Sequence, residues 1–100
     1  MRTIDEGAIK AHADRRFRSE YDYALFEYWR SAKVLTWLDR QGVQLRGQVL
    51  DAGCGGGGMP LSFAEESDHV HAIDLVDRFR DAGTRLAAEK GITNLSFLQA

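Results

Sequence analysis

Residues 49–58 read VLDAGCGGGG, and this stretch decides the fold. A short apolar run at 49–52 stops at a loop in which every residue of 53–58 except Cys54 is glycine. An apolar run that ends in turn residues is typical of a buried β-strand followed by a loop. Pro60 then fits the first turn of a helix over 60–66, because its missing N–H would find no partner there. We therefore predict a strand, a glycine loop and a helix in succession.

The same alternation continues to the end of the sequence. Residues 69–74 form a second short apolar run, and residues 95–99 form a third. Between them, Asp77 can cap a helix that extends to about Lys90 and ends at Gly91. Strands that alternate with helices in this way predict an α/β fold with a doubly wound parallel sheet.

Residues 1–47 have helical periodicity instead. Ile9, Ala13 and Phe17 are spaced four apart, which predicts a short amphipathic helix within residues 1–18. A second helix begins with a capping box at Ser19 and ends before Gly42. We therefore divide the chain into an N-terminal helical cap, 1–47, and an α/β part, 48–100. The apolar face expected on the second helix consists of Leu25, Tyr28, Trp29, Ala32, Leu35 and Leu38.

Length and composition exclude several classes of protein. One hundred residues fit one small domain, and a net charge of −2 lacks the basic excess of a nucleic-acid binder. A single cysteine cannot form an intramolecular disulfide, and no apolar run approaches the roughly 18 residues of a membrane span. The first six residues do not resemble a signal peptide. We expect a cytoplasmic protein.

The glycine loop has the position of a ligand site. It joins the end of a strand to the start of a helix, where free N–H groups and the helix dipole favour binding. Gly53, Gly55 and Gly58 fit the dinucleotide pattern G-x-G-x-x-G, whereas Gly53, Gly55 and Gly57 fit G-x-G-x-G. Glycine spacing alone does not choose between these patterns.

Two acids limit the chemistry of the ligand. Asp51, at the carboxyl end of the first strand, would repel a pyrophosphate and suits a cationic group such as an α-amino group. Asp74 closes the second strand, close to the offset of about 20 residues at which an acid accepts hydrogen bonds from ribose hydroxyls. These acids predict a ligand with a ribose and a cationic end.

The pair VLDAGCGGG (49–57) and VHAID (70–74) resembles the first two motifs of class I S-adenosylmethionine-dependent methyltransferases. The resemblance covers residues 48–100 and implies a Rossmann-like fold with S-adenosylmethionine as cofactor. It also implies that the methionine portion lies against Gly53, Gly55 and Gly57, that Asp51 holds its amino group, and that Asp74 binds both ribose hydroxyls. The methyl acceptor would be a small molecule with a nucleophilic oxygen, nitrogen or carbon.

The sequence departs from the family pattern in its extent. Sheets of this family have seven strands, and this sequence ends at Ala100, directly after the third expected strand. We therefore expect it to be the N-terminal part of a larger enzyme, with the acceptor pocket and any general base further along the chain. With the order third, second, first, the outer edge of the first strand is unpaired, which favours association through that edge, including homo-oligomers.

Two other functions fit parts of the sequence. The same glycines fit a nicotinamide- or flavin-dependent oxidoreductase, but the Asp51 carboxylate would repel the pyrophosphate of such a cofactor. A non-catalytic domain could bind a nucleoside, or a partner chain through the aromatic second helix. We expect most aromatic residues of this helix to be buried against the sheet or a partner, with Tyr21 and Tyr23 as candidates for a lid. His69 and His71 lack an obvious third metal ligand, so we predict no metal site. Cys54 lacks a neighbouring base, which disfavours a nucleophile.

Overall fold

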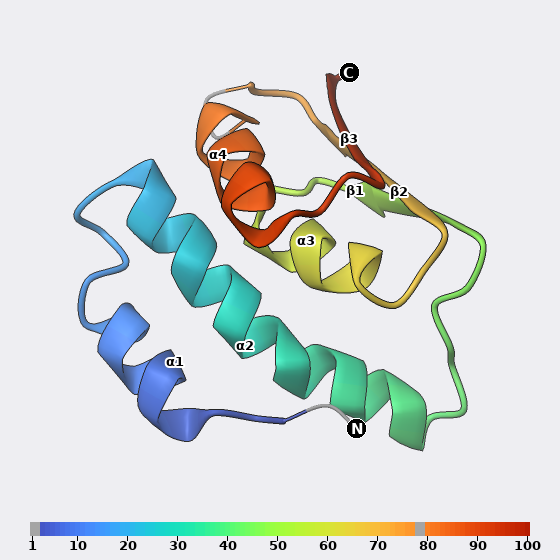
Figure 1. The fold of residues 1–100 in the computed structure, drawn as a ribbon, viewed down its shortest axis with the longest axis horizontal. Coiled ribbons are helices and arrows are strands. Elements are labelled where there is room, and N and C mark those ends of the chain that lie inside the picture. Colours follow the sequence, from blue (N-terminus) through green and yellow to red (C-terminus); the bar gives the residue numbers. More distant parts are fainter. Residues whose placement is uncertain (1–2, 78–79) are drawn as a thin grey trace.

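Three parallel strands form one sheet (Figure 1). The computed structural model describes residues 3–77 and 80–100. Within them the strand order is β1-β2-β3, which confirms the order expected from the sequence. The elements in chain order are α1 (Glu6–Ala13), α2 (Glu20–Arg40), β1 (Gln48–Ala52), α3 (Gly58–Ala64), β2 (His69–Asp74), α4 (Arg80–Lys90) and β3 (Leu95–Gln99).

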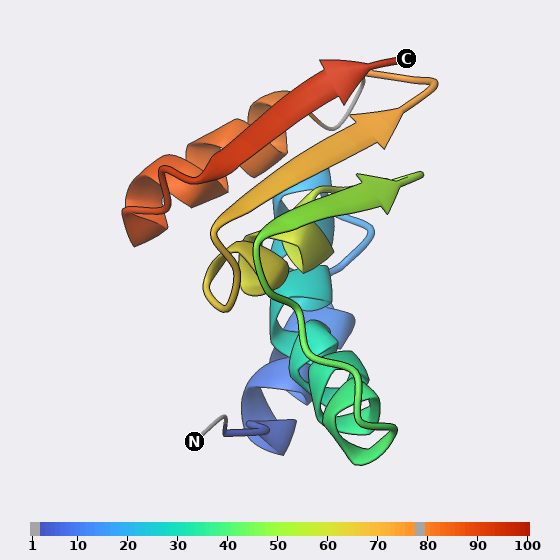
Figure 2. The same ribbon diagram turned by 90° about the vertical axis from the view of Figure 1, so that its right-hand side faces the viewer.

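The two faces of the sheet differ. Figure 2 shows the strands in front of α3 and α4, which lie behind the sheet. Val70 and Ala72 point toward these helices and are fully buried. On the other face, Leu50 and Leu98 are 64% and 63% exposed, and no helix of the described residues covers them. The observed part of the chain therefore supplies one helical layer of the α/β fold.

The ends of α2 lie where the capping residues predict them. The Ser19 side chain accepts a hydrogen bond of 3.0 Å from the N–H of Asp22, which satisfies one free donor of the first turn. Gly42 has a φ of +76°, and the N–H groups of Gly42 and Val43 donate to carbonyls in the last turn. This left-handed glycine cap confirms the expected end of the helix.

The first helix is shorter than its periodicity suggested. A short helix is present within residues 1–18, but α1 ends at Ala13. After it, the N–H groups of Arg15 and Arg16 donate to carbonyls three positions back instead of four, so the chain turns more tightly. The Arg16 guanidinium donates a second hydrogen bond to the same Ala13 carbonyl, at the end of the helix. Phe17, expected on the apolar face, is 80% exposed, so that expectation was wrong.

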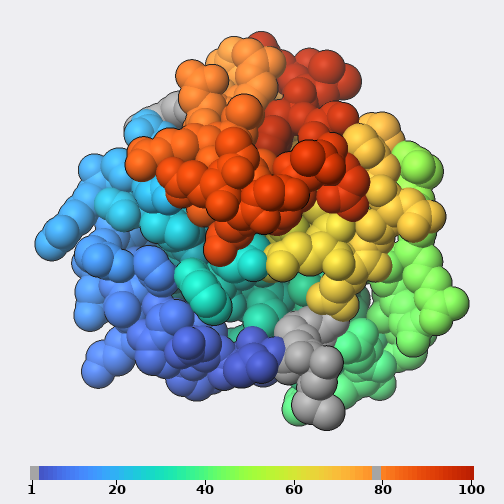
Figure 3. Space-filling model, viewed as in Figure 1, coloured from blue at the N-terminus to red at the C-terminus, as the bar shows by residue number. Residues whose placement is uncertain are grey.

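Helix α2 packs on α3 and α4, and Figure 3 shows their atoms in contact. Leu35 was expected on the apolar face and is buried, but the other three buried positions lie one residue away from that face, and most of its large apolar residues are only half-buried. None of the aromatic residues of α2 is fully buried among the described residues: Tyr21 and Tyr28 are partly buried against the core, and Trp37 is 58% exposed. Their burial against a partner stays a prediction. The buried residues of α2 are Ala24, Glu27, Ser31 and Leu35.

Small residues occupy this contact because the two helices approach closely. An added Cβ on Gly58 would lie 2.0 Å from the Ala24 carbonyl oxygen and 2.7 Å from the Tyr28 nitrogen. Ser31 on α2 also donates a hydrogen bond to Ser62 on α3. Helix α3 begins at Gly58, two residues before the expected start at Pro60, so Gly58 belongs to the helix at this contact. The helix ends at Ala64 rather than at residue 66.

Substitution of Gly58 tests this contact. Gly58→Ala is expected to lower the free energy of unfolding by about 1–3 kcal/mol, because backbone atoms must move to admit the methyl group. Gly7→Ala is the matched control: Gly7 is also helical, its added Cβ meets only the Asp5 carboxylate at 3.4 Å, and alanine favours a helix. Urea denaturation that gave the same result for both variants would contradict the close approach.

Helix α4 is described from Arg80 and ends at Lys90, and Gly91, with a φ of +68°, follows it. The first turn expected after Asp77 includes residues 78 and 79, which lie outside the described residues. In the described part of the chain, no helix is long and apolar enough to cross a membrane.

Candidate cofactor-binding site

The glycine loop turns sharply between β1 and α3. Gly53, Gly55 and Gly57 have φ values of +76°, +57° and +82°, a region in which glycine carries the least strain. An added Cβ on Gly53 or Gly55 would meet no atom within 4 Å, whereas on Gly57 it would lie 3.1 Å from the Phe97 ring. The first two glycines therefore expose their backbone to open space, and the third packs against β3.

Asp74 lies at the end of β2 and holds this loop. Its Oδ2 accepts a hydrogen bond of 2.9 Å from the N–H of Gly55, and its Oδ1 accepts one of 3.1 Å from the N–H of Val76. These two N–H groups lower the pKa of the Asp74 carboxyl, and that of Gly55 has the larger effect. Asp74 is therefore ionised at neutral pH. A carboxylate has about four acceptor positions, which leaves capacity for ligand hydroxyls. Asp74 and Gly55 also line a small pocket that reaches Gln99 on β3.

Asp51 is at the end of β1, beside the loop. Its Oδ2 is buried and accepts no hydrogen bond from the described residues. Burial raises the pKa of Asp51, and the negative charge of Asp74 raises it further. A buried carboxylate oxygen without a partner is costly unless a donor or a cation binds it. The geometry at Asp51 therefore suits the cationic end expected of the ligand.

Glu27 is a third acid at the loop, and the sequence motifs did not indicate it. It comes from α2, is only 9% exposed, and its Oε1 is buried without a hydrogen-bond partner among the described residues. Burial raises the pKa of Glu27 to about 7. The one signal for Glu27 in the sequence is its helical spacing from Ala24, Ser31 and Leu35, which places a charged residue on their face of the helix. This signal can be recognised only once the buried face of α2 is known.

Cys54 lies in the glycine loop, and His69 and His71 lie on β2. Burial raises the pKa of the Cys54 thiol to about 11, and the Asp51 and Asp74 carboxylates act in the same direction, so the thiol is a poor nucleophile at neutral pH. His69 hydrogen-bonds to Ser96 at 2.9 Å, and the described residues form no group of three or more His, Cys, Asp or Glu side chains that could hold a metal ion.

The two candidate lid tyrosines differ. Tyr21 donates a hydrogen bond to the Glu89 carboxylate, and the Arg85 guanidinium lies 3.9 Å from the centroid of its ring. It therefore ties α2 to α4. Tyr23 lies on the glycine loop instead, because an added Cβ on Gly56 would be 2.7 Å from its Cδ1 atom.

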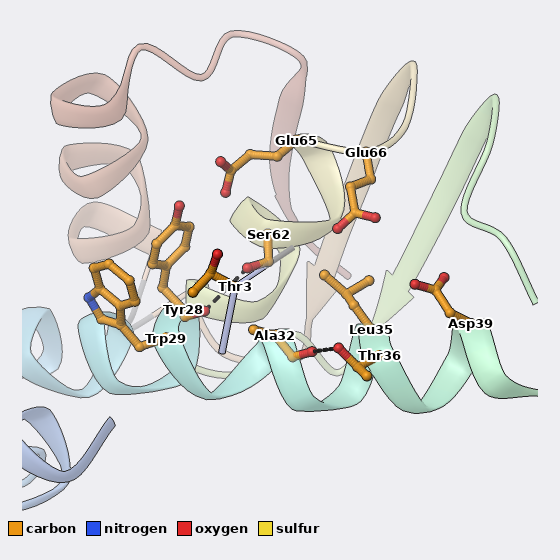
Figure 4. A pocket seen from close by; sticks show the side chains of 10 residues that line it. All are labelled: Thr3, Tyr28, Trp29, Ala32, Leu35, Thr36, Asp39, Ser62, Glu65 and Glu66. Carbon is orange, nitrogen blue, oxygen red and sulfur yellow. Dashed lines mark hydrogen bonds between the residues drawn. The ribbon is translucent and has the colours of Figure 1, made fainter. Parts of the chain in front are cut away.

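A larger pocket, of about 820 Å³, lies elsewhere (Figure 4). Helix α2 supplies most of its wall, including Tyr28 and Trp29, and Glu65 and Glu66 face it from the end of α3. None of its lining residues belongs to the glycine loop or to the ends of the strands. It is therefore separate from the candidate cofactor site.

Comparisons with known proteins found likeness in structure only. No protein-family model matches the chain, and no curated protein matches it in sequence. The chain is similar to DhpI in complex with S-adenosylhomocysteine, with 25% identity and a TM-score of 0.56 over 95% of this chain and 44% of that chain. It is similar to DhpI with S-adenosylmethionine and HEP, with 25% identity and a TM-score of 0.52 over 98% of this chain and 45% of that chain.

A third solved structure extends this likeness. It is a Methanococcus maripaludis protein provisionally assigned as an S-adenosylmethionine-dependent methyltransferase, 14% identical, with a TM-score of 0.59 over 100% of this chain and 43% of that chain. At this identity the likeness concerns the fold alone. The chain thus spans less than half the length of these structures. It has the Rossmann-like α/β fold of the N-terminal part of S-adenosylmethionine-dependent methyltransferases.

Proposed function

We propose that the chain provides the cofactor half-site of an enzyme that transfers a methyl group from S-adenosylmethionine to a nucleophilic oxygen, nitrogen or carbon of a small molecule. The observation that carries this proposal is the unpartnered, buried Oδ2 of Asp51 beside a glycine loop that faces open space. The likeness to two DhpI structures with S-adenosylhomocysteine or S-adenosylmethionine supports it.

The residues fit this cofactor. Asp51 offers a carboxylate to its amino group, and Asp74, already ionised and fixed by two N–H groups, offers free acceptor positions to the ribose hydroxyls. Gly53 and Gly55 lack the side chains that would keep a ligand from their backbone. A pyrophosphate would meet the carboxylate of Asp51 instead, which disfavours NAD and FAD.

The chain's contribution to catalysis is positional. The cofactor supplies an electrophilic methyl group on a sulfonium, which is a good leaving group. The loop and the two aspartates hold a bound cofactor in one orientation, and alignment with an acceptor can provide much of the rate enhancement. No described residue is needed as a covalent nucleophile, in agreement with the raised pKa of Cys54.

Ligand choice tests the proposal. We expect isothermal titration calorimetry to detect binding of S-adenosylhomocysteine, and no binding of NAD or FAD at the same concentrations. Binding of NAD without any response to S-adenosylhomocysteine would contradict the proposal and favour the oxidoreductase alternative.

Asp74→Ala tests the ribose contact. The variant loses a charged acceptor, and each hydrogen bond to a charged group is worth about 1.5–3 kcal/mol, so we expect affinity for S-adenosylhomocysteine to fall at least about tenfold. Asp68→Ala, an exposed aspartate before the other end of β2, is the control and should bind normally. Unchanged affinity in Asp74→Ala would remove this residue from the site.

A further inference from the structure

A buried carboxylate lies in the contact between the helical cap and the glycine loop. Glu27 is 9% exposed, and its Oε1 accepts no hydrogen bond from the described residues. This oxygen points at the loop, because an added Cβ on Gly56 would lie 2.4 Å from it. The N–H groups of Gly56 and Gly58 lie near this carboxyl, but a buried carboxylate oxygen without a hydrogen bond of its own still destabilises the fold. The Oε1 of Glu27 is therefore available to a donor from a ligand at the loop.

A second unpartnered oxygen lies close by. The Oδ2 of Asp51 is also buried, and the negative charge of Asp51 raises the pKa of Glu27 further. The two acids come from different elements, β1 and α2, and both are beside the same loop. A single cation between them would relieve both the repulsion and the missing hydrogen bonds.

We propose that Glu27 and Asp51 together hold the α-ammonium group of the cofactor's methionine portion, one carboxylate from the helical cap and the other from the sheet. This inference rests on the proposed function, since it needs the cofactor in this site. An ammonium group has three N–H donors, enough for two carboxylates and one further acceptor. The helical cap then selects nucleosides that carry an amino-acid portion.

A purely structural role for Glu27 is the rival. The N-cap of α3, Gly57, offers no side chain, and the Glu27 carboxyl lies near the N–H groups of Gly56 and Gly58. Glutamine could accept hydrogen bonds from these groups as glutamate does. Glu27→Gln therefore preserves a capping role and removes only the charge that an ammonium group requires.

Two nucleoside probes separate these roles in the intact protein. S-adenosylhomocysteine has the amino group, whereas 5′-methylthioadenosine has the same nucleoside without the amino-acid portion. At pH 8 we expect Glu27→Gln and Asp51→Asn each to weaken S-adenosylhomocysteine binding about tenfold or more, and to change 5′-methylthioadenosine binding less than about twofold. Asp39→Asn, which removes an exposed charge near the other end of α2, should bind both probes normally.

Proton release gives a readout that a capping role does not produce. Burial raises the pKa of Glu27 to about 7, so about half of these carboxyls are protonated at pH 7 and must release the proton to bind an ammonium group. The charged and titratable groups around it are Arg30, which lowers this pKa, Asp51, which raises it, and Cys54. Calorimetry in buffers of different ionisation enthalpy should show proton release at pH 7 that is smaller in Glu27→Gln.

Each outcome decides the inference. If Asp51→Asn weakens S-adenosylhomocysteine selectively and Glu27→Gln does not, the clamp is wrong while the cofactor site stands. If Glu27→Gln weakens both probes equally, the residue only shapes the loop. If the wild-type protein binds neither probe, the proposed function fails and the clamp fails with it.

Discussion

Gly55→Val is expected to abolish measurable binding of S-adenosylhomocysteine, a loss of at least about 100-fold, or about 3 kcal/mol. The added side chain would enter the open space in front of the loop, where the ligand must approach the backbone. A β-branched residue also tolerates the φ of +57° poorly, which costs about 1–3 kcal/mol of folding free energy. Titration calorimetry measures the affinity, and urea denaturation measures the strain.

Gly42→Val is the matched control for this substitution. Gly42 has a φ of +76°, and an added Cβ there also meets nothing within 4 Å, but it lies at the end of α2. It should therefore show a similar loss of stability with normal binding. If Gly55→Val folds and binds S-adenosylhomocysteine as the wild type does, the open side of the loop is not the ligand surface.

The unliganded protein is expected to lose stability as pH rises from about 5 to about 8, because of Glu27. Its pKa is about 7 in the folded state, against an ordinary value of 4.5 for a glutamate, so the folded state binds more protons over this range. The stabilisation is complete below the unfolded pKa and is lost as pH rises through the folded pKa. The shift corresponds to at most about 3 kcal/mol. Urea denaturation at several pH values measures this loss.

Glu27→Gln isolates the contribution of this one group. The raised pKa of Asp51 acts in the same direction, whereas burial lowers the pKa of His12, which has the opposite effect near pH 6. The informative quantity is therefore the difference between wild type and variant, which should grow with pH in favour of the variant. An equal slope in both proteins would show that Glu27 does not titrate differently in the folded state.

Local signals account for most of what the sequence predicts. Strand, glycine loop and helix follow from apolar runs and turn residues, and the caps at Ser19 and Gly42 depend on their immediate neighbours. Asp51 and Asp74 meet at one edge of the sheet because parallel strands end together, as their motif implies. That they bind a cofactor stays a prediction.

Features that depend on how helices pack were missed. Leu25 and its apolar neighbours suggested one face of α2. The close approach of Gly58 favours small residues at the contact, so Ala24 and Ser31 are the residues buried there. Glu27 lies on the same buried face of α2. A glutamate beside aromatic residues gives no sign in the sequence that its carboxyl faces a loop almost thirty residues away.

The contact between α2 and Gly58 also limits how such proteins can be recombined. A chimera that exchanged residues 1–47 for the corresponding region of another protein would bring new side chains against Gly56 and Gly58, where an added Cβ already meets atoms within 3 Å. The donor region must therefore match at the positions of Ala24 and Glu27. A chimera in this fold should therefore take the helical cap and the glycine loop from the same parent protein.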